Sequence, residues 1–294
     1  MNNSKLSIGT VQFGMQYGVA NNLKKTDVRH VVKILDTAHK EGINALDTAP
    51  IYGNSEVVLG EALCGQNWNI TTKIPPCEED VVSASYLKTI KKSLCHSLLS
   101  LGVQIVDGLL VHNCDDLFKP GGRDIFFELK KLQSLGLIKK IGVSVYTKDQ
   151  ILRVLDNFDI DLIQLPINIL DQRLIHSGCL EKLKKKGVEI HARSVFLQGL
   201  LLMPLNMIPD YFSPIIKKIE MFYQSARGLS LSKLELALGY VMGIHEIDQI
   251  LVGINTVSQL QEVIKATQVQ INPIEFRHLS IDNKVYTNPS LWKI

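Results

Sequence analysis

The sequence predicts one (β/α)8 barrel across residues 1–294, and three observations lead to this fold class. Short apolar runs alternate with longer amphipathic stretches eight times, with no linker between the units. Several runs, such as VDGLLV at 106–111, are nearly continuous, which is typical of strands covered on both faces of a parallel sheet. The 20 glycines form no G-x-G pair, so the usual turn of an open dinucleotide-binding sheet is missing.

The predicted strands are the short apolar runs, and each is followed by an amphipathic stretch that predicts a helix. The first helix is expected to end at Gly42, because glycine commonly follows the last helical turn. A longer insert separates the seventh strand from its helix. The strands cover residues 6–11, 44–47, 68–72, 104–111, 138–145, 161–166, 188–193 and 247–252. The helices cover residues 27–41, 55–63, 84–100, 125–135, 148–157, 179–186, 231–243 and 257–267.

Composition narrows the class of protein. Hydrophobic residues make up 46% and charged residues 21%, which suits a soluble globular chain. A net charge of +3 gives no reason to expect a nucleic acid partner. The five cysteines form no C-x-x-C pair, and no apolar run approaches the ~18 residues that span a bilayer. We therefore expect a cytoplasmic protein with reduced thiols, no leader peptide, no metal site and no membrane span, as a monomer or small homo-oligomer.

Active sites of such barrels lie at the C-terminal ends of the strands, so polar residues that follow the predicted strands are the candidates. In chain order they are Thr10, Gln12, Asp47, Tyr52, Lys73, His112, Asn113, Ser144, Gln164, Asn168, Arg193, Ser194, Asn255 and Thr256.

Four of these candidates follow three successive strands and are expected to lie together. The phenol of Tyr52, with an ordinary pKa of about 10, is a poor proton donor until the ammonium of Lys73 lowers that pKa. Asp47 can pair with Lys73, and His112 can orient a carbonyl oxygen. Such a set protonates a carbonyl oxygen while hydride reaches the carbon. Because no side chain donates hydride, a nicotinamide cofactor is implied.

Motifs along nearly the whole chain resemble one family. They are GTVQFG at 9–14, DTAPIYGNSEVVLGEAL at 47–63, TTK at 71–73, LLVHN at 109–113, IGVS at 141–144, IQLPIN at 163–168, QGLL at 198–201 and LVGINTVSQLQE at 251–262. In this order they resemble the aldo-keto reductase superfamily. The resemblance implies a (β/α)8 barrel that reduces aldehydes and ketones with NADPH, or oxidises alcohols in reverse. It also implies that Tyr52 is the general acid/base, that Lys73 and Asp47 tune it, and that His112 orients the carbonyl.

The resemblance also implies where the cofactor binds. Gln164 and Ser144 match residues that hold the nicotinamide carboxamide. Arg193 stands where many members stack a tyrosine on the nicotinamide ring, a task that a planar guanidinium can also perform. Gly253 and Gln259 stand where members that grip the 2′-phosphate have Lys and Arg. NADPH is favoured from the family, and these two neutral residues leave NADH as the alternative. The full set of expected cofactor contacts is Thr10, Ser144, Gln164, Arg193, Gly253, Asn255, Thr256, Gln259 and Glu262.

Other interpretations stay open. A non-catalytic barrel that binds nucleotide and regulates a partner protein shares this pattern, as the channel-associated members of the superfamily do. A short-chain dehydrogenase is disfavoured, because none of the eight tyrosines is followed by lysine four positions later. The substrate is expected to be a small carbonyl or alcohol. The opening GTVQFGMQYGV resembles bacterial members linked to sugar metabolism.

Overall fold

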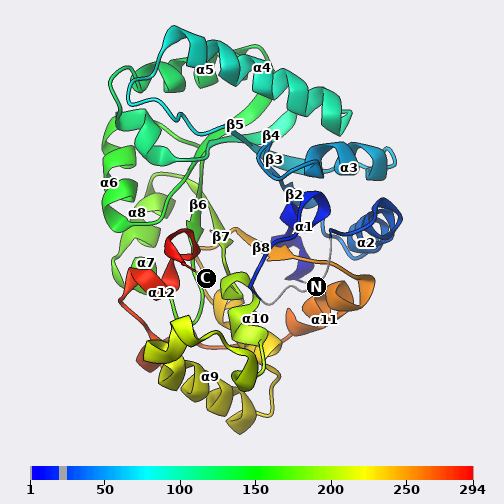
Figure 1. Cartoon of the computed structure of the whole chain (residues 1–294), viewed down its shortest axis with the longest axis vertical. Coiled ribbons are helices and arrows are strands. Elements are labelled where there is room, and N and C mark those ends of the chain that lie inside the picture. Colours follow the sequence, from blue (N-terminus) through cyan, green and yellow to red (C-terminus); the bar gives the residue numbers. More distant parts are fainter. Residues whose placement is uncertain (1, 20–24, 294) are drawn as a thin grey trace.

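A computed structural model describes residues 2–19 and 25–293 of the chain. In these residues eight parallel strands close into a barrel in sequence order, which confirms the predicted fold class. Figure 1 shows the strands as a ring with the helices outside it. The strands are β1 Leu6–Gly9, β2 Ala45–Asp47, β3 Asn69–Ile74, β4 Val106–Val111, β5 Ile138–Ser144, β6 Leu162–Pro166, β7 Glu189–Arg193 and β8 Gln249–Gly253.

The helices follow the strands as predicted, with additions. Those at the expected places are α2 Val28–Lys40, α3 Ser55–Ala62, α4 Ala84–Leu101, α5 Arg123–Ser134, α6 Lys148–Asn157, α8 Cys179–Lys185, α10 Lys233–Met242 and α11 Val257–Ala266. The additional ones are α1 Val11–Gly14, α7 Arg173–His176, α9 Ile216–Gly228 and α12 Lys284–Thr287. Short 3₁₀ helices cover Asn2–Lys5, Cys114–Phe118, Leu197–Leu202, Leu205–Met207, Asp210–Ile215, Pro273–Leu279 and Pro289–Leu291.

Capping residues explain where several helices begin and end. The Ser83 side chain accepts a hydrogen bond from the Tyr86 amide at the start of α4, and Gly102 ends that helix in the left-handed conformation. Ser232 and Glu235 form a capping box at the start of α10. These local signals lie where the hydrophobic pattern changes, so sequence and structure agree closely on the helix starts.

The predicted first strand is wrong at its C-terminal end. Val11 begins the short helix α1 instead of ending β1. The Thr10 amide donates to the carbonyl of Asp47 at 3.0 Å, and the Phe13 amide already bonds the Thr10 carbonyl at 2.9 Å, as in a helical turn. The apolar run continues through this change because α1 buries Phe13 against the core.

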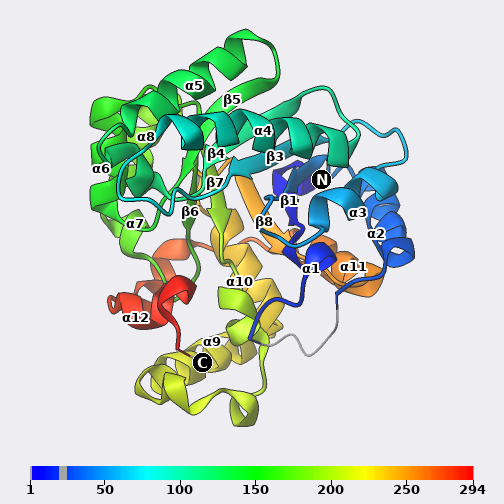
Figure 2. The same ribbon diagram turned by 45° about the horizontal axis from the view of Figure 1, so that its top comes forward.

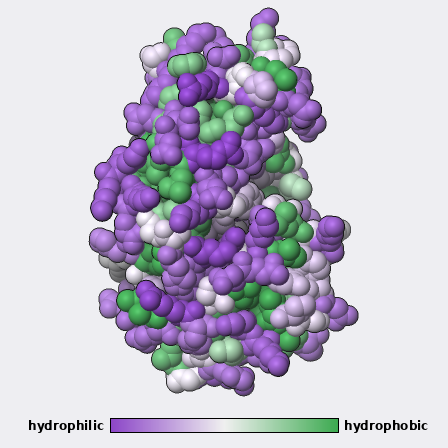
Figure 3. All heavy atoms as spheres, turned by 90° about the vertical axis from the view of Figure 1, so that its left-hand side faces the viewer, coloured by the Kyte–Doolittle hydropathy of each residue, from purple (hydrophilic) through white to green (hydrophobic). Residues whose placement is uncertain are grey.

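The insert after β7 forms a separate layer. Its helix α9 buries Ile219, Phe222 and Tyr223 and lies beyond the ring of barrel helices, next to α10, in both ribbon views (Figures 1 and 2). Most of the face in Figure 3 is hydrophilic, and its hydrophobic residues form small separate groups. Within residues 2–19 and 25–293, no helix has the length and apolarity that crossing a membrane requires.

Candidate active site

The four predicted catalytic residues meet at the C-terminal ends of β2, β3 and β4. Asp47 is the last residue of β2, Lys73 lies near the end of β3, and His112 follows β4 directly. Tyr52 is in the loop between β2 and α3. Parallel register pairs Asp47 with Thr71 and Lys73 with Leu110, so these strand ends are level with one another. The structure therefore brings together the residues that the strand-end argument selected.

Lys73 and Asp47 form a buried ion pair. The Lys73 Nζ donates to Asp47 Oδ1 at 2.9 Å, to Oδ2 at 2.8 Å and to the Thr48 carbonyl at 2.9 Å. The side chains are 1% and 5% exposed. Burial lowers the pKa of Lys73, but the Asp47 carboxylate and the Tyr52 phenol outweigh it, so the net pKa lies above the ordinary lysine value. Lys73 is therefore a fixed positive charge in the site.

Tyr52 lies against both Lys73 and His112. The Lys73 Nζ is 5.0 Å from the centroid of the Tyr52 ring, and the His112 ring meets that ring edge-on at 6.2 Å. Burial raises the pKa of Tyr52, Lys73 lowers it and Asp47 raises it again, with a net pKa above 10.0. Lys73 acts in the predicted direction, but burial and the Asp47 carboxylate outweigh it, so the pKa of Tyr52 shows no net decrease. At neutral pH Tyr52 carries its proton.

His112 is a neutral imidazole in this environment. Burial first and then the positive charge of Lys73 lower its pKa to about 4, against the opposing pull of Asp47. Its Nδ1 atom is buried and has no hydrogen-bond partner in the part of the chain that the structure describes. A neutral imidazole has one donor and one acceptor nitrogen, which suits it to hold a carbonyl oxygen without adding a charge.

Two glycines hold the loop that carries Tyr52. A Cβ on Gly14 would lie 1.7 Å from the Tyr52 carbonyl oxygen, and one on Gly53 would lie 2.5 Å from the Gly14 carbonyl oxygen. Gly53 also has a φ of 60°, which favours glycine. Ser55 ties the same loop to β1 by donating to the Thr10 carbonyl at 2.9 Å. The backbone of α1 therefore lies directly against Tyr52 and its loop.

Thr10 belongs to this scaffold. It is fully buried, and its hydroxyl donates to the Asp47 carbonyl at 2.9 Å and accepts from Ser55 at 2.8 Å. These bonds connect Thr10 to the backbone that carries Asp47, and its predicted contact with the cofactor stays a prediction.

Gln164 reaches the Asp47–Lys73 ion pair from another strand. Its Nε2 donates to Asp47 Oδ1 at 2.7 Å, and the residue is 1% exposed. Ser144, at the end of β5, is its register partner and is also buried. From the sequence, Gln164 was expected only at a strand end, and its contact with Asp47 was not predicted.

Arg193 ends β7 and spans the strand ends toward β5. Its guanidinium donates to the Val145 carbonyl at 3.2 Å and stacks on the Tyr146 ring at 4.1 Å. No carboxylate within residues 2–19 and 25–293 pairs with it. Its positive charge lowers the pKa of both Tyr52 and His112, so it acts electrostatically on these two side chains.

The loop after β7 is held in an unusual conformation. Ser194, Leu197 and Gln198 all have positive φ, at 59°, 48° and 53°. Gln198 then bonds the hydroxyl of Tyr17 through its side chain at 3.0 Å and the amide of Val19 through its carbonyl at 3.1 Å. Backbone strain of this kind commonly accompanies a binding site. In the sequence, Gln198 has no signal beyond the motif QGLL at 198–201.

The strand-8 candidates surround the start of α11. Thr256 caps that helix by accepting from the Gln259 amide at 3.1 Å, and Gln259 Oε1 accepts from the Asn255 amide at 2.8 Å. Gly253 is exposed at the end of β8, beside the side chain of Gln12. Glu262 is exposed on the helix surface, one turn beyond this group.

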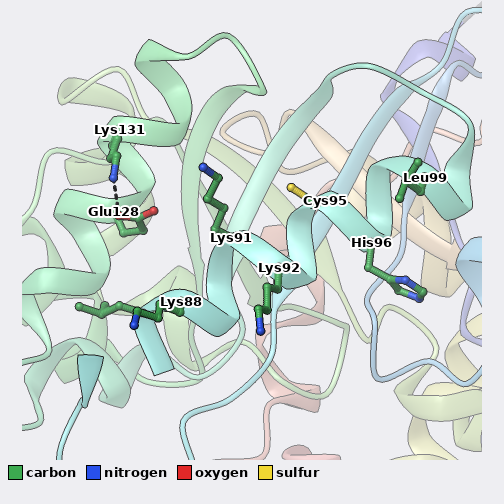
Figure 4. A pocket seen from close by; sticks show the side chains of 9 residues that line it. Lys88, Lys91, Lys92, Cys95, His96, Leu99, Glu128 and Lys131 are labelled. Carbon is green, nitrogen blue, oxygen red and sulfur yellow. Dashed lines mark ion pairs between the residues drawn. The ribbon is translucent and has the colours of Figure 1, made fainter. Parts of the chain in front are cut away.

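A groove elsewhere on the molecule is separate from this group. It lies between α4 and α5 on the outside of the barrel and has a volume of about 600 Å³. Figure 4 shows the side chains of Lys88, Lys91 and Lys92 on α4, and the Lys131–Glu128 ion pair on α5. All of its lining residues belong to these two outer helices, so it contains none of the strand-end residues.

Comparison with known proteins agrees with the geometry. The family model described as "Aldo/keto reductase family" matches residues 5–281. The chain belongs to this family. Its members reduce carbonyl compounds with nicotinamide cofactors.

Several individual proteins are similar to the chain. The NADH-specific methylglyoxal reductase of Escherichia coli is 26% identical over 80% of this chain and 82% of its own length. The L-galactose dehydrogenase of Arabidopsis thaliana is 29% identical, with 90% and 86% covered. Among solved structures, the holo form of an aldo-keto reductase from Bacillus halodurans superposes with a TM-score of 0.75 at 19% identity, covering 95% of this chain and 93% of its own. That structural likeness supports the barrel fold.

The strand-end residues of this aldo-keto reductase fit a nicotinamide cofactor. The Asn255 Oδ1 and Gln12 Oε1 atoms are buried acceptors without a donor among the described residues, and both lie near the glycine at the end of β8. The first turn of α11 offers free backbone N–H groups, which suit a phosphate. Gln164 and Ser144 add an amide and a hydroxyl group at neighbouring strand ends, where Gln164 contacts Asp47.

Proposed function

We propose that this aldo-keto reductase reduces an aldehyde or ketone to an alcohol with NAD(P)H, or runs the reverse oxidation, with Tyr52 as general acid/base. The observation that carries the proposal is the buried Lys73–Asp47 pair beside the Tyr52 ring, with His112 against the ring edge. A structural tyrosine needs no buried ammonium next to it, and burying that charge is costly.

Each side chain has a defined task in reduction. Tyr52 holds its proton at neutral pH and donates it to the carbonyl oxygen as negative charge develops there. Lys73 then stabilises the phenolate, and Asp47 keeps the ammonium in place. His112 donates a hydrogen bond to the same oxygen as a neutral group. In the direction of oxidation, Tyr52 must first lose its proton, so that direction is favoured at high pH.

A reduced nicotinamide, when bound, supplies the hydride. We propose that Gln164 and Ser144 hold its carboxamide and that Arg193 lies against its ring. Gly253, Asn255, Thr256 and Gln259 would hold the adenosine end, with Glu262 at the edge of that region.

The choice between cofactors depends on strand 8. The family resemblance favours NADPH, but Gly253 and Gln259 are neutral where a 2′-phosphate calls for cations. Gln259 is also engaged in capping α11. One relative is named an NADH-specific reductase. We therefore propose NADH as the better cofactor.

The substrate class is proposed from the relatives. Two of them are named L-galactose dehydrogenase and, at 31% identity over 51% of this chain, 6-dehydroglucose reductase, from Novosphingobium aromaticivorans. We propose a sugar or sugar-derived carbonyl as the substrate of this chain. The side chains of Tyr17, Gln198 and Arg193 offer hydrogen bonds that suit a polyhydroxylated molecule.

A panel assay tests the function. Oxidation of NADH and NADPH is followed with simple aldehydes, methylglyoxal and sugar-derived carbonyls, for wild type, Tyr52→Phe and Tyr211→Phe. Tyr211 is a matched control, because its hydroxyl only bonds the Val285 carbonyl in the C-terminal segment. We expect turnover by wild type and Tyr211→Phe and its loss in Tyr52→Phe. Tight cofactor binding without turnover on any substrate would instead support the non-catalytic regulatory barrel.

A further inference from the structure

We infer that Gln164 is a positioning residue for the proton donor: it holds Asp47 from the opposite wall of the barrel and thereby sets how readily Tyr52 releases its proton. This inference rests on the proposed function and goes beyond the carboxamide contact suggested for Gln164. β2 and β6 are four strands apart in either direction around the closed barrel. The 2.7 Å bond from Gln164 Nε2 to Asp47 Oδ1 therefore crosses the barrel interior.

The hydrogen bonds at Asp47 give Gln164 this influence. Oδ2 accepts from Lys73 at 2.8 Å, whereas Oδ1 is shared between Lys73 at 2.9 Å and Gln164. Both partners are almost fully buried, so no solvent replaces a missing donor. A buried carboxylate oxygen that loses one of two donors keeps more of its negative charge for the remaining one.

That redistribution reaches Tyr52 through Lys73. Asp47 and Lys73 act on the Tyr52 phenol in opposite directions, the first raising its pKa and the second lowering it. When Gln164 donates to Asp47, it offsets part of the carboxylate's field and leaves more of the ammonium's field for the phenolate. Removing the amide therefore makes the Tyr52 proton harder to release.

The same amide connects two parts of the site. The Nε2 of Gln164 donates to Asp47, and its Oε1 is a hydrogen-bond acceptor. Ser144 is the register partner of Gln164 on the neighbouring strand β5. If Oε1 accepts a hydrogen bond from a carboxamide, the amide is polarised and its donation to Asp47 strengthens. Occupancy of the carboxamide position and acidity of Tyr52 are then coupled through one side chain.

Substitutions at Gln164 distinguish an effect on the acidity of Tyr52 from a purely structural role of this side chain. Gln164→Met removes the amide at similar length, and Gln164→Glu places a second carboxyl group against Asp47 in the original shape. Ser144→Ala is the matched control, because it removes a neighbouring strand-end polar group that makes no bond to Asp47. Folding of each variant is checked by circular dichroism, and the two Gln164 variants act as substitutes for each other if one fails to fold.

The readout is the ionisation of Tyr52 itself. Tyrosine labelled with ¹³C at Cζ is titrated by NMR in the protein without cofactor, and Tyr52→Phe assigns the signal. We expect the midpoint to rise by about one pH unit in Gln164→Met and further in Gln164→Glu, with no change in Ser144→Ala. The basic limb of the pH profile for alcohol oxidation should shift in the same order.

Two outcomes separate failure of the inference from failure of the function. If Gln164→Met only weakens cofactor binding, and the Tyr52 midpoint stays at the wild-type value, the inference is overturned while the reductase function stands. If wild type turns over no substrate, the reductase function fails, but the NMR titration still decides the role of Gln164. The inference is also overturned if Ser144→Ala shifts the Tyr52 midpoint as strongly as Gln164→Met does.

Discussion

At the scale of single residues, the chemistry of this site depends on opposing electrostatic effects. Burial alone would make Tyr52 a weaker acid and Lys73 a weaker base. The contact between the two, and the pairing with Asp47, restores a fixed ammonium beside a neutral phenol. A charge that is already in place before a phenolate forms needs no reorganisation during a reaction. Such preorganisation is the usual origin of electrostatic catalysis.

The lowered pKa of His112 leads to a test at this scale. Because that pKa is about 4, the imidazole stays neutral from pH 5 upward, and kcat/KM for reduction should show no inflection near pH 6.5. The profile is measured between pH 4.5 and 9 for wild type and His112→Gln. We expect His112→Gln to lower the rate by about 10-fold to 100-fold without changing the shape of this profile. An inflection near pH 6.5 that disappears in His112→Gln would show that the histidine is charged in the working range.

At the scale of elements, the loops after β1 and β2 act as one unit. Gly14 in α1 and Gly53 after Tyr52 bring two backbones into direct contact. Ser55 adds its bonds to Thr10, which in turn donates to the Asp47 carbonyl. The strand ends fix Asp47 and Lys73, whereas this paired loop fixes Tyr52 relative to them.

Gly14→Ala tests the paired loop. Its Cβ would lie 1.7 Å from the Tyr52 carbonyl oxygen, so the loop must move and carry the phenol with it. A displacement of about 1 Å is expected to lower kcat about 100-fold. Gly228→Ala in α9 is the control, because nothing lies within 4 Å of its added Cβ. The measurement is kcat together with the Kd of NADH, and equal kcat values for the two variants would refute the role of the contact.

Elements were predicted well where the physical cause is local. Continuous apolar runs indicated strands such as β4, because both faces of a barrel strand are covered. The end of β1 was missed because the apolar pattern does not change where α1 begins. Helix α9 was hidden in the insert because it packs outside the regular ring of units.

Part of the site was predicted from the order of residues along the chain, and the part that depends on contacts between distant strands was missed. Asp47, Lys73 and His112 follow successive strands, so the order of the chain places them together once the barrel is assumed. The contact between Gln164 and Asp47 joins opposite walls of the barrel, and no spacing in the sequence reports it. The net pKa of Tyr52 was also out of reach, because burial is a property of the folded molecule.

At the scale of the whole molecule, the two ends of the barrel carry different groups of polar residues. The C-terminal ends of the strands carry the site. Nearer the N-terminal end, Lys140 on β5 pairs with Asp107 at 3.0 Å and with Glu189 at 2.7 Å, and Glu189 bonds His191 at 2.8 Å. This network joins β4, β5 and β7. Its position indicates a contribution to stability that is independent of catalysis.

Acid denaturation tests that contribution. His191 and Lys140 lower the pKa of Glu189 to about 2, below its ordinary 4.5, although burial opposes them. The stabilisation is therefore complete above pH 4.5 and is lost as pH falls toward 2. We expect Glu189→Gln to lower the free energy of unfolding at pH 7 by about 2 kcal/mol, after allowance for solvent screening. That gap should close between pH 4.5 and 2, as measured by urea denaturation, and kcat should be unchanged. A gap that is constant with pH would contradict the assignment.

The central claim is that Tyr52 supplies the proton, and single-turnover kinetics test it most directly. Tyr52→Phe, loaded with NADH, is mixed with an aldehyde that wild type reduces, and the loss of NADH absorbance gives the rate constant of the chemical step. Phenylalanine keeps the ring against Lys73 and His112 and removes only the hydroxyl. We predict a rate constant at least about 100-fold lower than wild type, with the Kd of NADH within about twofold. A rate constant within about threefold of wild type would contradict the account.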